Sequence, residues 1–355
     1  MTQATIDTLD ERLLHAVQEQ VPLAPRPYAA LAEQLGTSER DVLDRLSVMR
    51  WGSHAVIRQV GAIFDSKSLG YQSTLVAARI PAERLDAAAA EISRHPGVSH
   101  NYRRDHAYNL WYTLAVPPDS GLGLERTADI LHQRSGAVAT RLMPTLKMFK
   151  IGVKLDLAAD AKPQTAPSSN GNGAARKHKA ATAPLTERDK QLIRVLQQDL
   201  PITARPFDAF ADEAGVPVDE LLRAAEQYIA DGRMRRFSAV LRHRELGFDA
   251  NAMGVWQVPV DQQERFGTIA AGFSAVSHCY LRPTYEDWPY SIFTMVHART
   301  RAEGDATLAA IADATGVHDR SALYSTHEYK KVRVKYFTGD IEAWEQSVAA
   351  EPIAT

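Results

Sequence analysis

The chain opens with short segments in which apolar residues recur every three or four positions. Leu9–Gln20 has this spacing and predicts an amphipathic helix. Tyr28–Leu35 predicts a second helix, and a third runs from a cap at Ser38 to about Met49. The β-prone stretch Val56–Phe64 follows and could form a wing. Three helices and a strand in this order predict a winged helix-turn-helix domain.

Beyond this domain the pattern changes to alternating strands and helices. The order strand, helix, strand, strand, helix, strand is typical of a ferredoxin-like βαββαβ domain. In the first half the expected elements are Thr74–Ile80, Ala82–Arg94, Val98–Arg104, Asn109–Val116, Gly123–Gln133 and Ala137–Val153. In the second half they are Ala252–Val258, Gln262–Phe273, Val276–Arg282, Tyr290–Ala298, Asp305–Ala314 and Ala322–Phe337. Exposed sheet faces usually pair, so we expect the two halves to form a pseudo-dimer.

The two halves of the chain repeat one another in order. Arg26-Pro27-Tyr28 returns as Arg205-Pro206-Phe207 with a shift of 179 residues, and His100 returns as His278 with a shift of 178. A shift this constant indicates duplication followed by divergence. We therefore expect an α+β fold, with winged helix-turn-helix domains at 1–70 and 185–247, ferredoxin-like domains at 71–157 and 248–350, and a flexible linker at 158–184.

Composition narrows the class of protein. The 355 residues are 45% hydrophobic and 24% charged, as in ordinary globular domains. The sequence has no apolar run of about 18 residues and no secretory leader, so we expect a cytoplasmic protein without a membrane partner. The single cysteine, Cys279, excludes an internal disulfide or a cysteine-ligated cluster, and we expect it to be a small buried hydrophobe.

The order of the two domain types resembles the Lrp/AsnC family of transcription regulators, so a ligand-responsive DNA-binding regulator is one hypothesis. A recognition helix should carry excess positive charge, because it must approach phosphate. The expected recognition helices, Ser38–Arg50 and Val218–Asp231, have net charges of zero and -3. DNA binding is therefore not favoured, and the helix-turn-helix is interpreted as a scaffold.

One motif occurs in both halves. HNYRRDHAYNLWYTL begins at His100, and its counterpart HCYLRPTYEDWPYSIFTMVH begins at His278. Each motif offers His-x-Tyr-x-Arg and then an aromatic strand. Two half-sites rich in His, Tyr and Arg indicate a binding pocket for a large anion rather than an ordinary core.

These motifs resemble those of the siroheme decarboxylases, an offshoot of the Lrp/AsnC fold. RRFSAVLRHRELGFDANAMGVWQVP, which begins at Arg235, and its weaker copy, which begins at Ile57, support the same resemblance. The resemblance implies a carboxy-lyase in which two related subunits, separate or fused, remove CO2 from two acetate side chains of siroheme. The product, didecarboxysiroheme, feeds heme d1 synthesis or an alternative heme route. This chain looks like the fused form.

Siroheme is a flat iron macrocycle edged by carboxylates, so its site must supply cations and aromatic faces. The arginines expected to bind it are Arg103, Arg104 and Arg282 on the central strands and Arg58, Arg235 and Arg236 in the wing strands. Other expected contacts come from Tyr108, Asn109, Trp111, Tyr112, Trp288, Tyr290 and Phe293. Lysines of the last strands, Lys147, Lys150, Lys330 and Lys331, could hold further carboxylates or could be solvated edge residues.

Decarboxylation of an acetate leaves carbanion character on the methylene carbon and needs an electron sink and a proton donor. The macrocycle itself can accept the electrons, so we expect no cofactor beyond the iron of the substrate. The expected proton donors are His100, His106, His278 and His297, with Tyr102 and Tyr280. A histidine could instead ligate the siroheme iron. Because His297 aligns with Ala115, we expect two chemically distinct half-sites.

Several matters stay open from the sequence. The aromatic residues could simply pack, because aromatic side chains on neighbouring strands commonly do. The sequence does not assign a decarboxylation to either half, and it leaves a further homo-oligomer open.

Overall fold

The computed structural model describes residues 7–53, 55–151, 184–242 and 250–350. The chain divides into two compact units. Unit 1 comprises Met1–Tyr71, His178–Leu246 and Lys335–Gly339, and unit 2 comprises Gln72–Lys177, Gly247–Val334 and Asp340–Thr355. Each unit therefore contains the equivalent domain from both halves of the sequence. The expected linker at 158–184 lies outside the described residues, apart from its last residue.

Unit 1 contains the two helix-turn-helix domains. Its elements are α1 (Thr8–Glu19), α2 (Pro27–Leu35), α3 (Glu39–Trp51), β1 (Ile57–Phe64), α6 (Glu187–Leu196), α7 (Phe207–Ala214), α8 (Val218–Ala230) and β7 (Met234–Leu241). Local sequence explains their limits. Asp7 and Asp10 form a capping box at the start of α1, and Gly36 ends α2 in the left-handed conformation at φ 73°.

The strand that follows each helix-turn-helix does not form a hairpin wing of its own. Instead β1 pairs antiparallel with β7, its counterpart in the other half, in a two-stranded sheet with Gly61 opposite Ser238. Each half thus supplies one strand of a shared ribbon. The sequence pattern indicated the strand correctly, but it could not indicate its partner.

Unit 2 contains both ferredoxin-like domains. From the first half it has β2 (Gln72–Arg79), η1 (Ala82–Arg84), α4 (Leu85–Arg94), β3 (Val98–Arg104), β4 (Leu110–Val116), α5 (Gly123–Ser135), β5 (Ala139–Met143) and β6 (Lys147–Ile151). From the second it has β8 (Ala250–Trp256), η3 (Val260–Gln262), α9 (Gln263–Ala271), β9 (Val276–Leu281), β10 (Ile292–Ala298), α10 (Arg301–Thr315), β11 (Arg320–Lys331) and α11 (Asp340–Ala350). The strands form one nine-stranded sheet in the order β5-β2-β4-β3-β11-β8-β10-β9-β6.

The two halves exchange their last strands. The start of β11 pairs with β8 of its own half, and its continuation pairs with β3 of the other half. In the first half, β5 pairs with β2 of its own half, while β6 pairs with β9 of the other. The expected single strand Ala137–Val153 is therefore wrong. It is divided near Pro144, which has no N–H to donate to a ladder.

One further strand has other bounds than expected, and one helix was not expected. The expected strand Ala322–Phe337 begins at Arg320 and ends at Lys331. Helix α11 was not anticipated from the sequence. Its Trp344 packs on the helix-side core of the first half, with its ring 4.3 Å from that of His95, measured between ring centroids.

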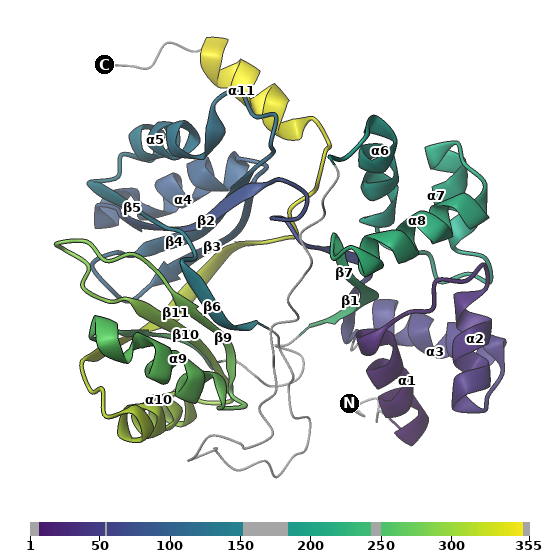
Figure 1. Ribbon diagram of the computed structural model, residues 1–355, viewed down its shortest axis with the longest axis horizontal. Helices are drawn as coiled ribbons and strands as arrows, with labels where there is room; N and C mark the ends of the chain where they lie inside the picture. The colour runs from purple at the N-terminus through teal and green to yellow at the C-terminus, as the bar shows by residue number, and fades with distance from the viewer. Residues whose placement is uncertain (1–6, 54, 152–183, 243–249, 351–355) are drawn as a thin grey trace. The chain divides into compact units, whose positions relative to one another are not determined.

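The helices cover only one face of each half-sheet. Helices α4 and α5 lie on the first half-sheet, and α9 and α10 lie on the second (Figure 1). Apolar residues of the strands alternate, so one set packs under these helices and the other set faces away. The side chains that face away from the helices form a core shared by both halves, separate from the two cores under the helices. It includes Ala77, Trp111, Met143, Met253, Val255, Trp288, Phe293 and Leu323. This helix-free side carries the candidate site.

Candidate active site

The His-x-Tyr-x-Arg motif of the first half lies on β3, with its three side chains on the helix-free side. Asn101 points to the other side, where its Nδ2 donates to the carbonyl oxygen of Ala89 on α4. Because side chains alternate along a strand, His100, Tyr102 and Arg104 share the opposite face. The rings of His100 and Tyr102 are stacked with centroids 6.1 Å apart.

The second half repeats this row on β9. Cys279 and Val276 belong to the core under α9 and α10, so His278, Tyr280 and Arg282 face the helix-free side. Cys279 is buried, which confirms the expectation of a small buried hydrophobe, and its burial raises the pKa of the thiol to about 12. The structure therefore has two equivalent rows, one on each half-sheet.

Each row ends in a buried arginine that crosses to the other half. Arg104 is 5% exposed, and its Nη1 donates to the carbonyl oxygen of Leu323 at 2.7 Å. Arg282 is 8% exposed, and its Nη1 donates to the carbonyl oxygen of Met143. Leu323 and Met143 are equivalent positions of β11 and β5. The arginines thus follow the pseudo-twofold repeat of the fold.

Neither arginine has a negative partner among the described residues. Each guanidinium lies against the tyrosine of its own row, at 5.8 Å for Arg104 over Tyr102 and 4.9 Å for Arg282 over Tyr280. The Nε of each has no hydrogen-bond partner within the described chain. Burial lowers the pKa of both side chains to about 10. A buried cation without a counter-ion is costly, so this arrangement is suited to an anionic ligand.

A β-bulge precedes each row. In half one, β4 pairs with Val98 and then with His100, which makes Ser99 the extra residue. In half two, β10 pairs with Val276 and then with His278, which makes Ser277 the extra residue. A bulge turns a side chain away from its normal direction, and these bulges bring each serine hydroxyl to the neighbouring histidine.

The serine contacts differ between the halves. Ser99 Oγ lies 3.0 Å from His100 Nδ1 and 2.6 Å from Thr113 Oγ1, so this chain ends in a hydroxyl. Ser277 Oγ lies 2.8 Å from His278 Nδ1 and also 2.8 Å from His297 Nε2. The expected asymmetry of the half-sites is therefore present in the hydrogen bonding.

The exchanged strands make a second difference. Residues directly opposite on paired strands share a face. Lys331 lies opposite His100 and Glu328 lies opposite Tyr102, with Lys331 Nζ 4.0 Å from Glu328 Oε2. In the second half the equivalent partners are apolar, because Ile151 lies opposite His278 and Met148 opposite Tyr280. The first row is bordered by charges and the second by hydrocarbon.

His106 lies beside the motif of the second half. Its ring is 5.3 Å from that of Trp288, measured between centroids, and its Nδ1 accepts the Tyr108 N–H at 3.0 Å. Burial lowers the pKa of His106, and the nearby Asp105 opposes this effect. His106 is thus biased toward the neutral form and contacts aromatic residues from both halves.

Three residues not expected from the sequence, Arg141, Tyr285 and Asp287, connect the two halves near His106. Tyr108 Oη donates to Asp287 Oδ2 at 2.6 Å, and Arg141 Nε and Nη2 both donate to the same carboxylate at 3.0 Å. Tyr285 Oη donates to the carbonyl oxygen of Leu142. Asp287 and Tyr285 belong to the PTYEDWP insertion of the second motif. The insertion is visible in the sequence, but the residues of the first half that it contacts cannot be identified from the sequence.

The expected aromatic contacts pack as core residues. Trp111, Trp288 and Phe293 are buried together, with Tyr290 partly buried against them. Trp111 Nε1 donates to the Tyr108 carbonyl oxygen at 2.7 Å, whereas Trp288 Nε1 has no partner among the described residues. These rings can border a ligand at the edge of the core, but in this structure they pack against one another in tilted and edge-to-face contacts.

Three expected binding residues have other surroundings. Asn109 bonds the backbone of Ile80 through both its Oδ1 and its Nδ2. Tyr112 is buried in the core under α4 and α5, so the expectation that it faces the site is wrong. Arg103 is exposed and shares the face of Asn101, because it lies two positions along the strand. The structure therefore does not bring these residues to the row of His100.

The remaining cations are distributed over both units. Arg58, Arg235 and Arg236 lie in unit 1 on the shared ribbon of β1 and β7, and Arg235 forms an ion pair with Asp65. In unit 2, Lys150 Nζ donates to the Phe273 carbonyl oxygen, and Lys330 Nζ donates to those of Ser93 and His95. Lys147 pairs with Glu264. Lys150 thus bonds the exchanged strand β6 to the C-terminal end of α9, and Lys330 bonds the exchanged strand β11 to the C-terminal end of α4.

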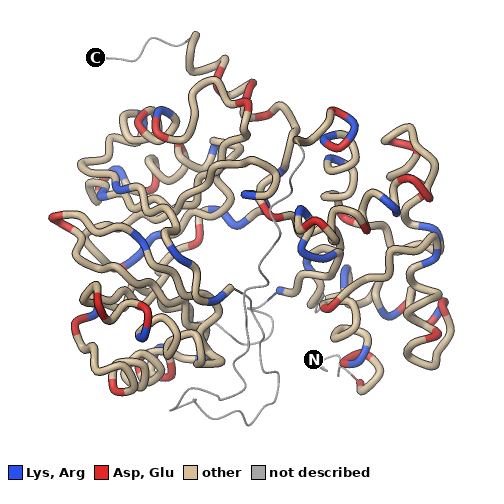
Figure 2. The backbone as a smooth tube through the Cα atoms, viewed as in Figure 1, with Lys and Arg blue, Asp and Glu red and all other residues tan. Residues whose placement is uncertain are grey.

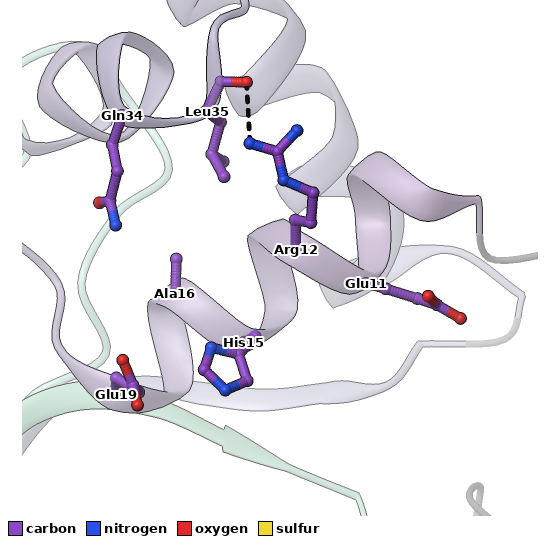
Figure 3. A pocket seen from close by; sticks show the side chains of 7 residues that line it. All are labelled: Glu11, Arg12, His15, Ala16, Glu19, Gln34 and Leu35. Carbon is purple, nitrogen blue, oxygen red and sulfur yellow. Dashed lines mark hydrogen bonds between the residues drawn. The ribbon is translucent and has the colours of Figure 1, made fainter. Parts of the chain in front are cut away.

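Unit 1 has a surface hollow between α1 and α2. It is lined by Glu11, Arg12, His15, Ala16, Glu19, Gln34 and Leu35 (Figure 3). Arg12 Nη2 donates to the Leu35 carbonyl oxygen at 3.3 Å. The lining contains one imidazole and no residue of either His-x-Tyr-x-Arg row, so we do not assign it to the candidate site.

Comparison with known families defines the class of the protein. Residues 68–150 and 245–330 match the AsnC-like ligand binding domain, and residues 10–58 and 189–235 match the siroheme decarboxylase NirDL-like HTH domain. The chain is thus a duplicated protein of the Lrp/AsnC type, with a helix-turn-helix and a ligand-binding domain in each half.

Individual relatives define the family. A siroheme decarboxylase of Hydrogenobacter thermophilus is 36% identical over 335 residues, which are 94% of this chain and 96% of the relative. A siroheme decarboxylase beta subunit of Methanosarcina barkeri is 41% identical over 151 residues, 42% of this chain and 99% of the relative. A crystal structure of the siroheme decarboxylase NirDL with an iron-uroporphyrin III analogue superposes with a TM-score of 0.76 at 31% identity, covering 97% of this chain and 99% of that chain. The chain belongs to the siroheme decarboxylase family.

The described residues contain neither a membrane-spanning helix nor a metal-binding cluster. No helix there has the length and apolar character needed to cross a membrane. No cluster of three or more His, Cys, Asp or Glu residues suited to a metal ion is found in the same residues.

Proposed function

We propose that this protein is a siroheme decarboxylase that removes CO2 from two acetate side chains of siroheme to give didecarboxysiroheme. The observation that carries the proposal is the pair of equivalent, buried arginines without carboxylate partners, Arg104 and Arg282. Family membership and the complex of the related NirDL protein with a tetrapyrrole analogue support the same conclusion.

The arginines suit a ligand with several carboxylates. A guanidinium binds a carboxylate through charge-assisted and often bidentate hydrogen bonds. The Nε–H of Arg104 and that of Arg282 have no partner among the described residues, so each can donate one more hydrogen bond to an anionic oxygen. Each also contacts the opposite half through Leu323 or Met143. A tetrapyrrole with carboxylates around its rim would therefore supply the missing negative charge.

The histidine and tyrosine of each row would supply protons. Loss of CO2 leaves the electrons of the broken C–C bond on the methylene carbon, and the conjugated ring of the substrate can delocalise them. Protonation of that carbon by His100 or His278 would give a methyl group. Tyr102 stacks on His100 and Tyr280 lies tilted against His278, and each could orient its imidazole or replace it as the donor. The substrate supplies its own iron, and no other cofactor is required.

The fused chain has the counterparts of two subunits. The M. barkeri beta subunit corresponds to less than half of this chain, in agreement with a chain that joins two such subunits. The exchanged strands β6 and β11 make each half necessary for the sheet of the other. We propose that the two halves work as one pseudo-dimer, with each half supplying one of two distinct half-sites.

The surface of the helix-turn-helix domains does not favour the alternative, a DNA-binding regulator. Acidic as well as basic residues lie on its helices (Figure 2). The segment Val218–Asp231, which contains α8, carries a net charge of -3, and this would oppose binding to phosphate.

The proposal is tested by incubating the purified protein with siroheme under anaerobic conditions and determining the product masses. We expect successive loss of one and then two CO2 from each siroheme. Unchanged siroheme would contradict the proposal. In that case, retention on a specific DNA sequence that weakens with salt would favour the regulator.

A further inference from the structure

The second half-site contains a hydrogen-bonded chain with two imidazoles. Ser277, which is 3% exposed, lies between them with its Oγ 2.8 Å from His278 Nδ1 and 2.8 Å from His297 Nε2. At the far end, Asn251 Oδ1 lies 2.6 Å from His297 Nδ1. Strand pairing fixes this last contact, because Asn251 and His297 lie directly opposite one another on β8 and β10.

The first half-site has no second imidazole at this place. Ala115 occupies the position of His297, and Ser73 lies opposite Ala115 as Asn251 lies opposite His297. The chain from His100 passes through Ser99 to Thr113, which is a hydroxyl and does not titrate near neutral pH. A titratable group at the end of the chain is therefore a feature of the second half-site.

The donor and acceptor rules couple the two imidazoles. The Asn251 oxygen is an acceptor, so His297 carries a proton on Nδ1. If His297 is neutral, its Nε2 accepts from Ser277, and Ser277 in turn accepts from Nδ1–H of His278, leaving His278 Nε2 without a proton. If His297 is doubly protonated, Nε2–H donates to Ser277, and the serine donates to His278 Nδ1 at 2.8 Å in preference to the Met295 carbonyl oxygen at 3.3 Å. The proton of a neutral His278 then lies on Nε2, where it can be donated.

We infer that Ser277 is a positioning residue that relays a proton from His297 to His278 and so sets the tautomer of His278. This inference rests on the proposed function. As an acetate loses CO2, His278 Nε2–H would pass to the methylene carbon, the hydroxyl proton of Ser277 would pass to His278 Nδ1, and Nε2–H of His297 would replace it. One carboxylate and one imidazolium are consumed, and CO2, a methyl group and a neutral His297 are formed.

The surroundings suit such a relay. On the same face lie Tyr280 of β9, the buried cation Arg282 directly after β9, and Met148 and Ile151 of β6. The imidazole that Ser277 joins to His278 is His297, which makes His297 the proton source of the proposed relay, and a substrate carboxylate would favour its charged form.

Three serine variants test the relay in the full-length protein with siroheme. Ser277→Ala removes the bridging hydroxyl, and we expect kcat to fall by about 100-fold with KM unchanged, the usual effect of losing general acid catalysis. Ser277→Thr keeps a hydroxyl and should restore most of the rate. Ser291→Ala is the matched control, because Ser291 is also buried in this half but its hydroxyl donates to the Val258 carbonyl oxygen. It should keep the wild-type kcat.

Nitrogen-15 chemical shifts of the imidazoles give an independent measurement. In the wild type, we expect the proton of a neutral His278 to move from Nδ1 to Nε2 when His297 becomes doubly protonated at low pH. In Ser277→Ala, we expect the tautomer of His278 to be independent of the protonation of His297. If the wild type converts siroheme and Ser277→Ala has the same kcat, the relay is overturned while the proposed function remains intact. Equal loss of kcat in Ser277→Thr and Ser277→Ala would also overturn it. A wild-type protein that leaves siroheme unchanged would instead contradict the proposed function.

Discussion

Replacement of Arg282 by methionine separates stability from substrate binding. Burial lowers the pKa of Arg282 to about 10 from 12.5. A pKa difference of one corresponds to about 1.4 kcal/mol, so the charged side chain costs the folded state about 3 kcal/mol at neutral pH. Methionine would remove this cost and fill much of the same space.

The variant also loses favourable contacts. The hydrogen bond to the Met143 carbonyl oxygen contributes about 2 kcal/mol because its donor is charged. The contact with the Tyr280 ring adds about 1 kcal/mol. Gains and losses nearly cancel, so we expect Arg282→Met to leave the free energy of unfolding within about 1 kcal/mol of the wild type.

Substrate binding should respond very differently. A buried partner of a carboxylate is worth about 2–5 kcal/mol, so we expect the affinity for siroheme to fall by about 100-fold. Urea unfolding gives the stability, and a titration followed by the visible absorption of siroheme gives the dissociation constant. Arg104→Met, the equivalent variant of the first half, should behave in the same way.

A buried arginine outside the site provides the control. Arg233 in unit 1 is buried and paired with Asp231 at 3.6 Å. Because Arg233→Met leaves that carboxylate without its partner, it should lower the free energy of unfolding without changing siroheme affinity. The reasoning would be refuted if Arg282→Met unfolded as readily as Arg233→Met while binding siroheme with wild-type affinity.

Three further predictions concern other parts of unit 2. Burial lowers the pKa of His95 to about 3, below its unfolded value of 6.5. The free energy of unfolding should therefore fall by about 1.4 kcal/mol per pH unit as the pH drops below 6.5, and His95→Phe should remove this contribution in urea unfolding. Burial and then the bond to Asp287 raise the pKa of Tyr108 to about 12, so Asp287→Asn should lower this pKa in an ultraviolet titration, and an unchanged value would exclude the bond. Gly97→Ala would place a Cβ 2.0 Å from the Ala115 carbonyl oxygen, so it should cost at least about 2 kcal/mol of unfolding free energy, and a stable variant would refute this contact.

The sequence predicted the strands that carry the two motifs. The repeated His-x-Tyr-x-Arg motif predicted two half-sites on central strands, and in the structure the alternation along β3 and β9 brings the His, Tyr and Arg of each motif to one face. The same alternation separates Arg103 from Arg104 and Tyr112 from Trp111. These neighbours were expected to act together, but adjacent residues of a strand point to opposite faces.

Contacts between the halves could not be predicted in this way. Hydrophobic periodicity specifies which face of a strand is buried but not which strand lies beside it. The pairing of β1 with β7, the exchange of β6 and β11, and the bonds of Arg104 and Arg282 to the opposite half all depend on such pairing. The bulges at Ser99 and Ser277 were likewise not visible, because an extra residue in one strand is defined only by its partner.

The most direct test of the central claim compares siroheme with siroheme whose carboxylates have been converted to methyl esters. The two compounds share the ring and the iron but differ in charge. If Arg104 and Arg282 are neutralised by substrate carboxylates, absorption titrations will show that siroheme binds and that the ester binds at least 100-fold more weakly. Equal affinity for the two compounds would show that the buried arginines do not hold the substrate.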